Sequence, residues 1–150
     1  IAAGGIADGR QIAAAFMLGA KGVQVGTRFL VCDECTIAHE YKEKVLKAKD
    51  IDTVVTGKRL GHPVRSIRNS FTKEYQACEY DRTNCDDEKL ESMGTGKLRL
   101  AAREGDVKNG TVLAGQVAAM VKKEQPAKEI IEEMFTQAEE TLKGATQWVK

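Results

Sequence analysis

The chain has 150 residues, 42% of them hydrophobic, and its 23 basic and 22 acidic side chains give a net charge of +1. This length is sufficient for a buried core, and no apolar run reaches the ~18 residues that a membrane-spanning helix needs. The near-neutral charge argues against a dedicated nucleic-acid-binding protein and leaves an electrostatic partner to a local patch. Because the chain starts within an apolar run and no targeting pattern precedes it, we expect it to be part of a longer protein.

A β-α-β unit is expected at the amino-terminal end. Residues 1–3 and 22–25 are short apolar runs of the kind that form parallel strands covered by helices. Between them, residues 8–18 predict a helix, with Asp8 as its N-cap and Gly19 just beyond its end. Its apolar stripe follows the spacing i, i+3, i+4, i+7 at Ile12, Ala15, Phe16 and Gly19.

Glycine-rich loops follow both predicted strands. Gly4 and Gly5 follow the first, and Gly26 and Thr27 follow the second. Loops with little side chain leave backbone N–H groups free to point at an anion. A glycine pair after a strand is also often only a tight turn, but two such loops on consecutive strands predict a phosphate-binding site.

Helices and loops are expected in the middle of the chain. A charged helix is predicted over residues 41–49, a short strand over 52–56 and a further helix over 71–80. The acidic residues within 81–91 predict a solvated excursion.

Two more helices are expected near the carboxyl-terminal end. Residues 111–121 form a strongly apolar run with small side chains, and residues 126–142 begin with a proline that suits the first turn of a helix. The buried stripe of the second helix is predicted to consist of Ile130, Ile131, Met134, Phe135, Ala138 and Leu142.

An ordered succession of motifs connects the chain to a known family. The motifs are residues 1–29, residues 41–53, the run from Gly61-His62-Pro63 to residue 69, and residues 105–107 leading into Ala114-Gly115-Gln116. In this succession the chain closely resembles the carboxyl-terminal half of the FMN-dependent enoyl-acyl-carrier-protein reductase II group. The nitronate monooxygenases are near relatives of that group.

The resemblance implies an α/β fold, the C-terminal part of a (β/α)8 TIM barrel, in which this chain supplies strands 7 and 8 and additional C-terminal helices. Residues 1–30 would be the last two strands of the FMN-binding barrel with their intervening helix. Residues 31–110 would be an excursion near the active-site face, and residues 111–150 helices that return to the barrel. The chain alone is expected to be inactive, because the histidine thought to assist at the flavin lies upstream. Since two strands cannot close a barrel, whether the chain folds alone is left open.

The resemblance also implies the cofactors and a set of binding residues. Loops after strands 7 and 8 of such barrels commonly hold a phosphate. Gly4 and Gly5 would approach the phosphate of FMN, with the positive end of a helix facing it. The second loop would contribute Gln24, Val25, Gly26 and Thr27, with Gln24 among the flavin contacts.

The reaction that the resemblance implies is the reduction of trans-2-enoyl-acyl-carrier-protein in fatty acid synthesis, with NADH or NADPH reducing FMN first. The alternative is a nitronate monooxygenase that oxidises alkyl nitronates with O2. Gly61-His62 favours the reductase. The histidine thought to assist at the flavin lies upstream, so the catalytic residue is unknown. Two remoter alternatives are a purine-nucleotide dehydrogenase or reductase barrel and a phosphate-binding module without enzymatic activity.

Three polar residues leave two interpretations open. Gln24 is a flavin contact or a satisfied core amide. Gln116 faces the ligand cavity or bonds a neighbouring carbonyl. His62 is a hydrogen-bonding loop residue or a proton donor.

Four cysteines raise the question of a metal site. Cys32 and Cys35 have the C-x-x-C spacing that zinc sites use, but six residues separate Cys78 from Cys85 and no histidine completes the set. No metal is therefore expected. All four cysteines are expected to be free thiols in a reducing cytoplasm.

Residues 53–73 contain basic side chains and no acidic one; the basic residues are Lys58, Arg59, Arg65, Arg68 and Lys73. Such a segment could steer acidic acyl carrier protein or the phosphates of NADH, and the alternative is a solvated loop face. The partner that the resemblance implies is an acyl-carrier-protein thioester. Neither nucleic acid nor a membrane span is expected, and a homodimer is left open.

Overall fold

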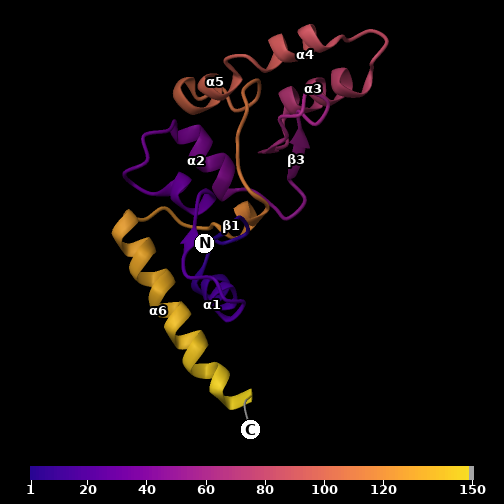
Figure 1. Ribbon diagram of the computed structural model, residues 1–150. Helices are drawn as coiled ribbons and strands as arrows, with labels where there is room; N and C mark the ends of the chain where they lie inside the picture. Colours follow the sequence, from indigo (N-terminus) through magenta and orange to yellow (C-terminus); the bar gives the residue numbers. More distant parts are fainter. Residues whose placement is uncertain (149–150) are drawn as a thin grey trace.

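The computed structural model describes residues 1–148. Its regular elements are β1 (Ala2–Ala3), α1 (Gly9–Met17), β2 (Val23–Gln24), α2 (His39–Leu46), β3 (Thr53–Thr56), β4 (Val64–Ile67), α3 (Ser70–Tyr80), α4 (Asp87–Gly94), α5 (Lys97–Glu104) and α6 (Ala127–Ala145). Short 3-10 helices span Thr27–Val31, Gln116–Met120 and Thr146–Trp148. Figure 1 shows α3, α4 and α5 at one end of the molecule and α6 running past α1 at the other, with β1 and α2 between them.

The expected β-α-β unit is confirmed. β1 and β2 pair in parallel, with Ala2 opposite Val23 and Ala3 opposite Gln24. α1 begins at a capping box, in which the N–H of Gln11 donates to the Asp8 carboxylate at 3.2 Å and the Gln11 amide oxygen accepts from the N–H of Asp8 at 3.2 Å. The sequence therefore specifies both the start of this helix and the direction in which the chain returns.

α6 packs along α1 and buries one stripe of its surface. Ile130, Met134 and Ala138 are buried against Ile12 and Ala13 of α1. The prediction was wrong for Ile131 and Phe135, which are 48% and 52% exposed. Each of these two lies one residue past a buried position, and therefore on the flank of the stripe. Leu142 is partly buried against the same cluster.

Close approach of α1 and α6 depends on a glycine. A Cβ placed on Gly9 would lie 2.2 Å from the carbonyl oxygen of Met134. The N–H of Gly9 also donates to the side-chain amide oxygen of Gln137 at 2.7 Å. The first turn of α1 is thus fixed directly to the backbone of α6.

The middle of the chain folds as a hairpin followed by three helices. β3 confirms the predicted strand and pairs with β4 in antiparallel register from Thr53 opposite Ile67 to Thr56 opposite Val64. α2 and α3 confirm the helices expected over 41–49 and 71–80, although α2 ends at Leu46. β4 and α5 were not predicted.

The segment 81–91 is only partly a solvated excursion. Its second half begins α4, and Leu90 is fully buried against Phe71 and Tyr75 of α3. The large apolar side chain of Leu90 therefore helps to tie this acidic segment to the rest of the molecule.

The predicted helix over 111–121 is wrong. Residues 111–115 are extended and lie along β4, with the N–H of Ile67 donating to Val112 O at 2.8 Å and the N–H of Ala114 donating to Arg65 O at 3.3 Å. Only Gln116–Met120 turns into a 3-10 helix. Pairing with an available strand edge satisfies the buried backbone here, and so overrides the local composition.

The four cysteines separate into a bonded pair and two free thiols. Cys78 and Cys85 form a disulfide with their Cα atoms 5.4 Å apart, so the expectation of free thiols is wrong for these two. Cys32 and Cys35 are free. Among residues 1–148 no group of three or more His, Cys, Asp or Glu side chains could hold a metal ion.

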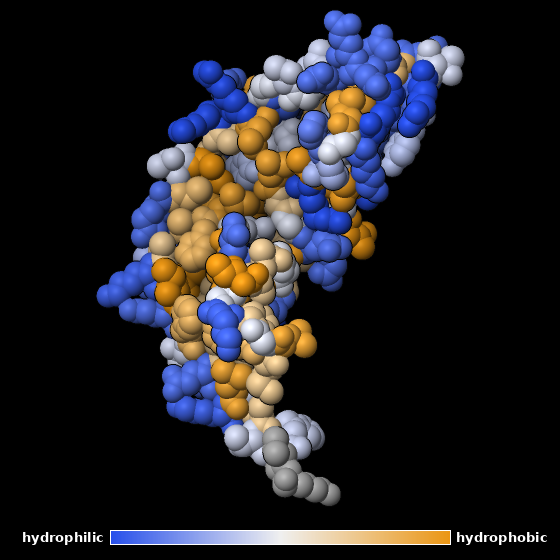
Figure 2. Space-filling view, viewed as in Figure 1, coloured by the Kyte–Doolittle hydropathy of each residue, from blue (hydrophilic) through white to orange (hydrophobic). Residues whose placement is uncertain are grey.

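Apolar surface is concentrated over the middle of the molecule. Figure 2 shows hydrophobic residues around β1 and α1, while hydrophilic residues cover the α3 and α4 end. Ile1 and Leu18 are each 90% exposed. In a closed barrel, neighbouring strands and helices cover such a face. No helix within the described residues has the length and apolarity to cross a membrane.

Candidate phosphate-binding site

A cavity of 270 Å³ lies at the carboxyl ends of β1 and β2. Five of the six predicted binding residues line it, namely Gly4, Gly5, Gln24, Gly26 and Thr27, together with Ala3, Ile6, Gly115 and Val117. The two glycine loops, separate in sequence, therefore share one concave surface.

The first loop exposes its backbone to this cavity. Gly4 and Gly5 have φ angles of +83° and +74°, in the left-handed region that residues with a side chain rarely adopt. No heavy atom lies within 4 Å of a Cβ built on either glycine. Within residues 1–148, the N–H groups of Gly5 and Ile6 donate to no other protein group. They are therefore available as donors to an anion.

The second loop adds backbone donors and a hydroxyl. The N–H groups of Gly26 and Thr27 likewise donate to no protein group in the described part of the chain. Thr27 Oγ1 accepts a hydrogen bond from the N–H of Gly115 at 2.9 Å. Because that oxygen is an acceptor here, its own hydrogen remains free to donate toward the cavity.

Val25 is the predicted binding residue that does not line the cavity. Its side chain is half-buried and packs against the cluster that contains Ile6 and Ile12. Alternation along a strand explains this placement, because Val25 points to the opposite face from Gln24. Any contact of Val25 with a ligand would have to come from its backbone.

The amino end of α1 is not open to an anion, contrary to the expectation of a free positive helix end. The Asp8 carboxylate caps it, and the N–H of Ala7 donates to the side-chain oxygen of Gln11 at 2.7 Å. Gly9 N–H is bound to Gln137. The donors that remain belong to the loop that precedes the helix.

The structure places the three polar residues whose interpretations were left open. Gln24 is exposed and lines the cavity, so it is not a satisfied core amide. His62 is exposed, and its side chain makes no hydrogen bond within residues 1–148; only its N–H bonds, donating to Gly57 O at 3.0 Å. His62 therefore makes a hydrogen bond in its loop through its backbone, and a role as a proton donor stays a prediction. Gln116 is exposed, lies outside the cavity lining and has no side-chain hydrogen bond among the described residues.

A second cavity of 420 Å³ adjoins the first. It shares Gly26, Thr27 and Gly115 with the first cavity and adds Leu30, Val64, Arg65, Leu113 and Ala114. Arg65 is the charged residue of this lining, and its guanidinium donates to Thr53 Oγ1 at 3.1 Å. Sequence reasoning missed Val64 and Leu113 because it did not predict that residues 111–115 pair with β4.

Buried polar side chains hold the walls of both cavities. Arg28 follows Thr27 directly, is buried, and donates to Lys123 O at 3.2 Å and to the side chain of Gln125. The Tyr41 hydroxyl donates to Leu113 O at 2.8 Å, and burial raises the pKa of this phenol to about 12. Both contacts link loops that are far apart in sequence.

The basic segment is not a uniform patch. Arg59 is bound by carbonyl and carboxylate groups at the end of α3 and the start of α4 and has a 9% exposed side chain. Lys58, Arg68 and Lys73 are exposed, and Arg65 lines the second cavity. Arg59 therefore stabilises the fold. Lys58, Arg65, Arg68 and Lys73 are the basic residues of this segment that could attract an acidic partner.

A profile of the nitronate monooxygenase family matches residues 1–137. The chain belongs to this family. Over 143 residues it is 38% identical to a probable nitronate monooxygenase of Staphylococcus saprophyticus. The aligned region covers 95% of this chain and 39% of the relative. A probable nitronate monooxygenase of Staphylococcus aureus is 33% identical over the same length. The family resemblance inferred from the motifs is thereby confirmed.

Two solved structures are similar to the chain in fold. The superposition on FabK from Thermotoga maritima covers 98% of this chain and 46% of the FabK chain, with a TM-score of 0.92 and 43% sequence identity. A nitroalkane oxidase from Streptomyces ansochromogenes matches 95% of this chain and 40% of its own, with a TM-score of 0.76 and 29% identity. The chain thus spans less than half the length of these relatives. It has part of a TIM-barrel-type α/β fold, and the assignment of β1 and β2 to strands 7 and 8 stays a prediction.

Proposed function

We propose that this chain is the phosphate-binding part of an FMN-dependent oxidoreductase that reduces trans-2-enoyl thioesters of acyl carrier protein with NADH or NADPH. The observation that supports it most is the group of unpaired backbone N–H donors in two adjacent loops that both line one 270 Å³ cavity. Membership of a family of flavin-dependent enzymes supports a flavin nucleotide as the ligand for these donors.

The residues present fit the phosphate end of FMN. A phosphate needs several donors at short range, and the N–H groups of Gly5, Ile6 and Gly26 have no competing protein acceptor. Gly4 and Gly5 leave space for phosphate oxygens to reach the backbone. The site has no basic side chain in its lining, so the backbone and the Thr27 hydroxyl would hold the phosphate.

Each residue of the site would have a distinct part in binding. Thr27 would hold the phosphate while Gly115 fixes its hydroxyl at 2.9 Å. Gln24 projects from the same edge and would contact the polar part of the flavin. When bound, FMN supplies hydride transfer between the nicotinamide cofactor and the enoyl thioester. The residue that delivers the proton is unknown.

The reductase is preferred because the 43% identity to FabK exceeds the 29% identity to the nitroalkane oxidase, and because the Gly61-His62 motif favours a reductase. The second candidate is a nitronate monooxygenase that oxidises alkyl nitronates with O2. Its support is the family profile and the 38% identical probable nitronate monooxygenase. The two candidates share the flavin site and differ in the source of electrons.

The proposed reaction would place the protein in the cytoplasm with acyl carrier protein as its partner. The test uses the full-length protein. Its visible spectrum reports flavin, NADH consumption is followed with a crotonyl thioester, and O2 consumption is followed separately with an alkyl nitronate in the absence of NADH. The proposal expects a yellow protein that consumes NADH with the thioester. A colourless protein would reject the flavin site, and turnover of alkyl nitronate alone would reject the reductase.

A further inference from the structure

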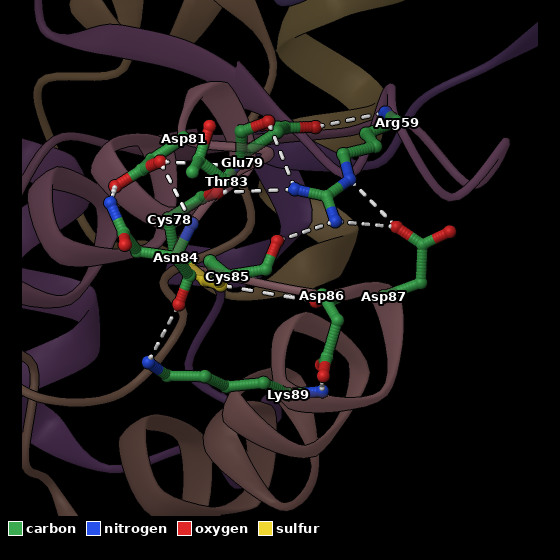
Figure 3. A network of polar contacts seen from close by, with 10 residues as sticks. All are labelled: Arg59, Cys78, Glu79, Asp81, Thr83, Asn84, Cys85, Asp86, Asp87 and Lys89. Carbon is green, nitrogen blue, oxygen red and sulfur yellow. Dashed lines mark hydrogen bonds and ion pairs between the residues drawn. A yellow bond between two sulfur atoms is a disulfide. The ribbon is translucent and has the colours of Figure 1, made fainter.

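A polar clamp joins the turn of the β3–β4 hairpin to the connection between α3 and α4 (Figure 3). The guanidinium of Arg59 donates to Cys78 O at 3.2 Å, to Cys85 O at 2.7 Å and to the Asp87 carboxylate at 2.7 Å. The carboxylate of Glu79 accepts the backbone N–H of Arg59 at 3.0 Å. Arg59, Cys78, Glu79, Cys85 and Asp87 are called the Arg59 clamp below.

The clamp satisfies groups that would otherwise be unpaired. Among the described residues Cys85 O accepts from Arg59 alone, whereas Cys78 O, in the last turn of α3, also accepts the N–H of Asp81 at 3.2 Å. Asp87 lies in the first turn of α4. A buried guanidinium needs such acceptors on all sides, so Arg59 and the two helix ends depend on one another.

The disulfide bonds the two residues whose carbonyls bind Arg59. Cys78 and Cys85 are seven positions apart. The four residues directly before Cys85, Asp81 to Asn84, are exposed. Local bonds hold that segment, with the Asp81 carboxylate accepting the N–H groups of Thr83 and Asn84 at 3.2 Å and 3.1 Å. The disulfide therefore fixes the position of Cys85 O relative to the end of α3.

The β3–β4 hairpin connects the Arg59 clamp with the second cavity. Arg59 lies in the turn between β3 and β4, and the next strand contributes Val64 and Arg65 to the 420 Å³ cavity beside Thr27. α3 also holds β3 through the Gln76 side chain, which donates to Val55 O at 3.4 Å. A looser clamp would therefore loosen one wall of that cavity.

We propose that Cys78 and Cys85 are a reversible thiol–disulfide site whose oxidation state sets how firmly Arg59 anchors the hairpin. In a reducing compartment a disulfide persists only transiently, which makes this bond a candidate for control. Cys78 is partly exposed and Cys85 is 3% exposed, so an incoming thiolate meets the Cys78 sulfur first.

The exchange is balanced with a dithiol as the reductant. Its first thiolate attacks Cys78 Sγ, the S–S bond breaks, and Cys85 leaves as a thiolate in the residue whose carbonyl Arg59 binds. The second thiol of the reductant then resolves the mixed disulfide and releases Cys78. Two electrons and two protons pass from the dithiol to the cysteine pair, and the reductant becomes a disulfide.

The expected size of the effect follows from loop closure. For a loop of this length, a disulfide favours the closed arrangement roughly 50-fold. Hydrogen exchange in residues 53–67 of the full-length protein should therefore accelerate by up to roughly 50-fold on reduction, while exchange in α1 stays constant. Alkylation followed by mass spectrometry should label Cys78 and Cys85 only after reduction.

Variants separate the clamp from the disulfide alone. In the double variant Cys78→Ser, Cys85→Ser, exchange in 53–67 should be fast and independent of reductant, whereas Cys35→Ser should behave as the unmodified protein. In Arg59→Gln the disulfide still forms, but the hairpin should no longer respond to reduction. An unchanged hairpin on reduction, or alkylation of both cysteines without reductant, would overturn the proposal. A full response in Arg59→Gln would also overturn it. None of these readouts depends on flavin or activity.

Discussion

The backbone N–H of Gly115 donates to Thr27 Oγ1 at 2.9 Å. This bond connects the extended segment beside β4 with the loop after β2, and it fixes the only hydroxyl among the described residues that line the candidate phosphate site. A Cβ on Gly115 would lie 3.2 Å from the same oxygen. The position of Thr27 is therefore set from outside its own loop.

Replacing Thr27 with valine should weaken FMN binding by about 10-fold, because the shape is kept while one hydrogen bond to a charged ligand is lost. The variant also leaves Gly115 N–H without its acceptor. Thr27→Ser keeps the hydroxyl and should bind FMN nearly as the unmodified protein does. The measurement is the dissociation constant from quenching of flavin fluorescence, and equal constants for the two variants would contradict the assigned role.

Replacing Gly5 with valine should abolish retention of flavin during purification. The side chain would enter the space beside the unpaired N–H groups, and the φ of +74° adds a strain of about 1–2 kcal/mol. Gly19 is a matched control for strain, since it has a φ of +95° and also has open space around it but does not line the cavity. Gly19→Val should lose stability and keep flavin. Loss of flavin in both variants would mean that strain alone explains the result.

Replacing Gly9 with alanine should destabilise the protein by about 1–3 kcal/mol, since the added methyl group overlaps the α6 backbone at Met134. Gly144 lies in α6, and no atom lies within 4 Å of a Cβ built on it, so Gly144→Ala should be neutral or slightly stabilising. Urea unfolding of the full-length variants provides the free energies. A Gly9→Ala protein as stable as Gly144→Ala would show that the two helices are less closely packed than described.

Stability should fall in alkaline solution through Tyr41. Its pKa is raised from 10.0 to about 12 by burial, so the native state favours the neutral phenol. A raised pKa contributes stability that is complete below the unfolded value and is lost as pH rises through the folded value, here between 10.0 and about 12. Tyr41→Phe should lose this pH dependence and about 1 kcal/mol near neutral pH, because Leu113 O loses its donor. Unfolding free energies of both proteins across this range check the sign.

Local patterns predicted the elements whose signals are contained in short stretches of sequence. Asp8 and Gln11 specify the start of α1, and the 3.6-residue period places Ile130 and Met134 in the core. The two glycine loops were predicted for the same reason, since they come directly after their strands. Grouping these loops in one cavity needed only the parallel pairing of β1 with β2.

Features that depend on distant partners could not be predicted in this way. Val112 and Ala114 have the composition of a helix, but a free edge of β4 pairs with them. Val25 lies in the predicted loop, but its side chain packs against the core and does not line the cavity. Cys78 and Cys85 pair because α3 and α4 bring them together, which spacing alone does not reveal. Arg59 is one of several basic residues in its stretch of sequence, but in the structure its side chain is 9% exposed and paired with Asp87.

The most direct test of the phosphate site compares FMN with riboflavin, which lacks only the phosphate, as ligands of the flavin-free full-length protein. Several charge-assisted hydrogen bonds from the loops of Gly5 and Thr27 should make FMN bind at least about 100-fold more tightly than riboflavin. The preference should shrink in Gly5→Val and persist in Gly19→Val. Equal affinity for the two flavins in the unmodified protein would contradict a site that holds the cofactor by its phosphate.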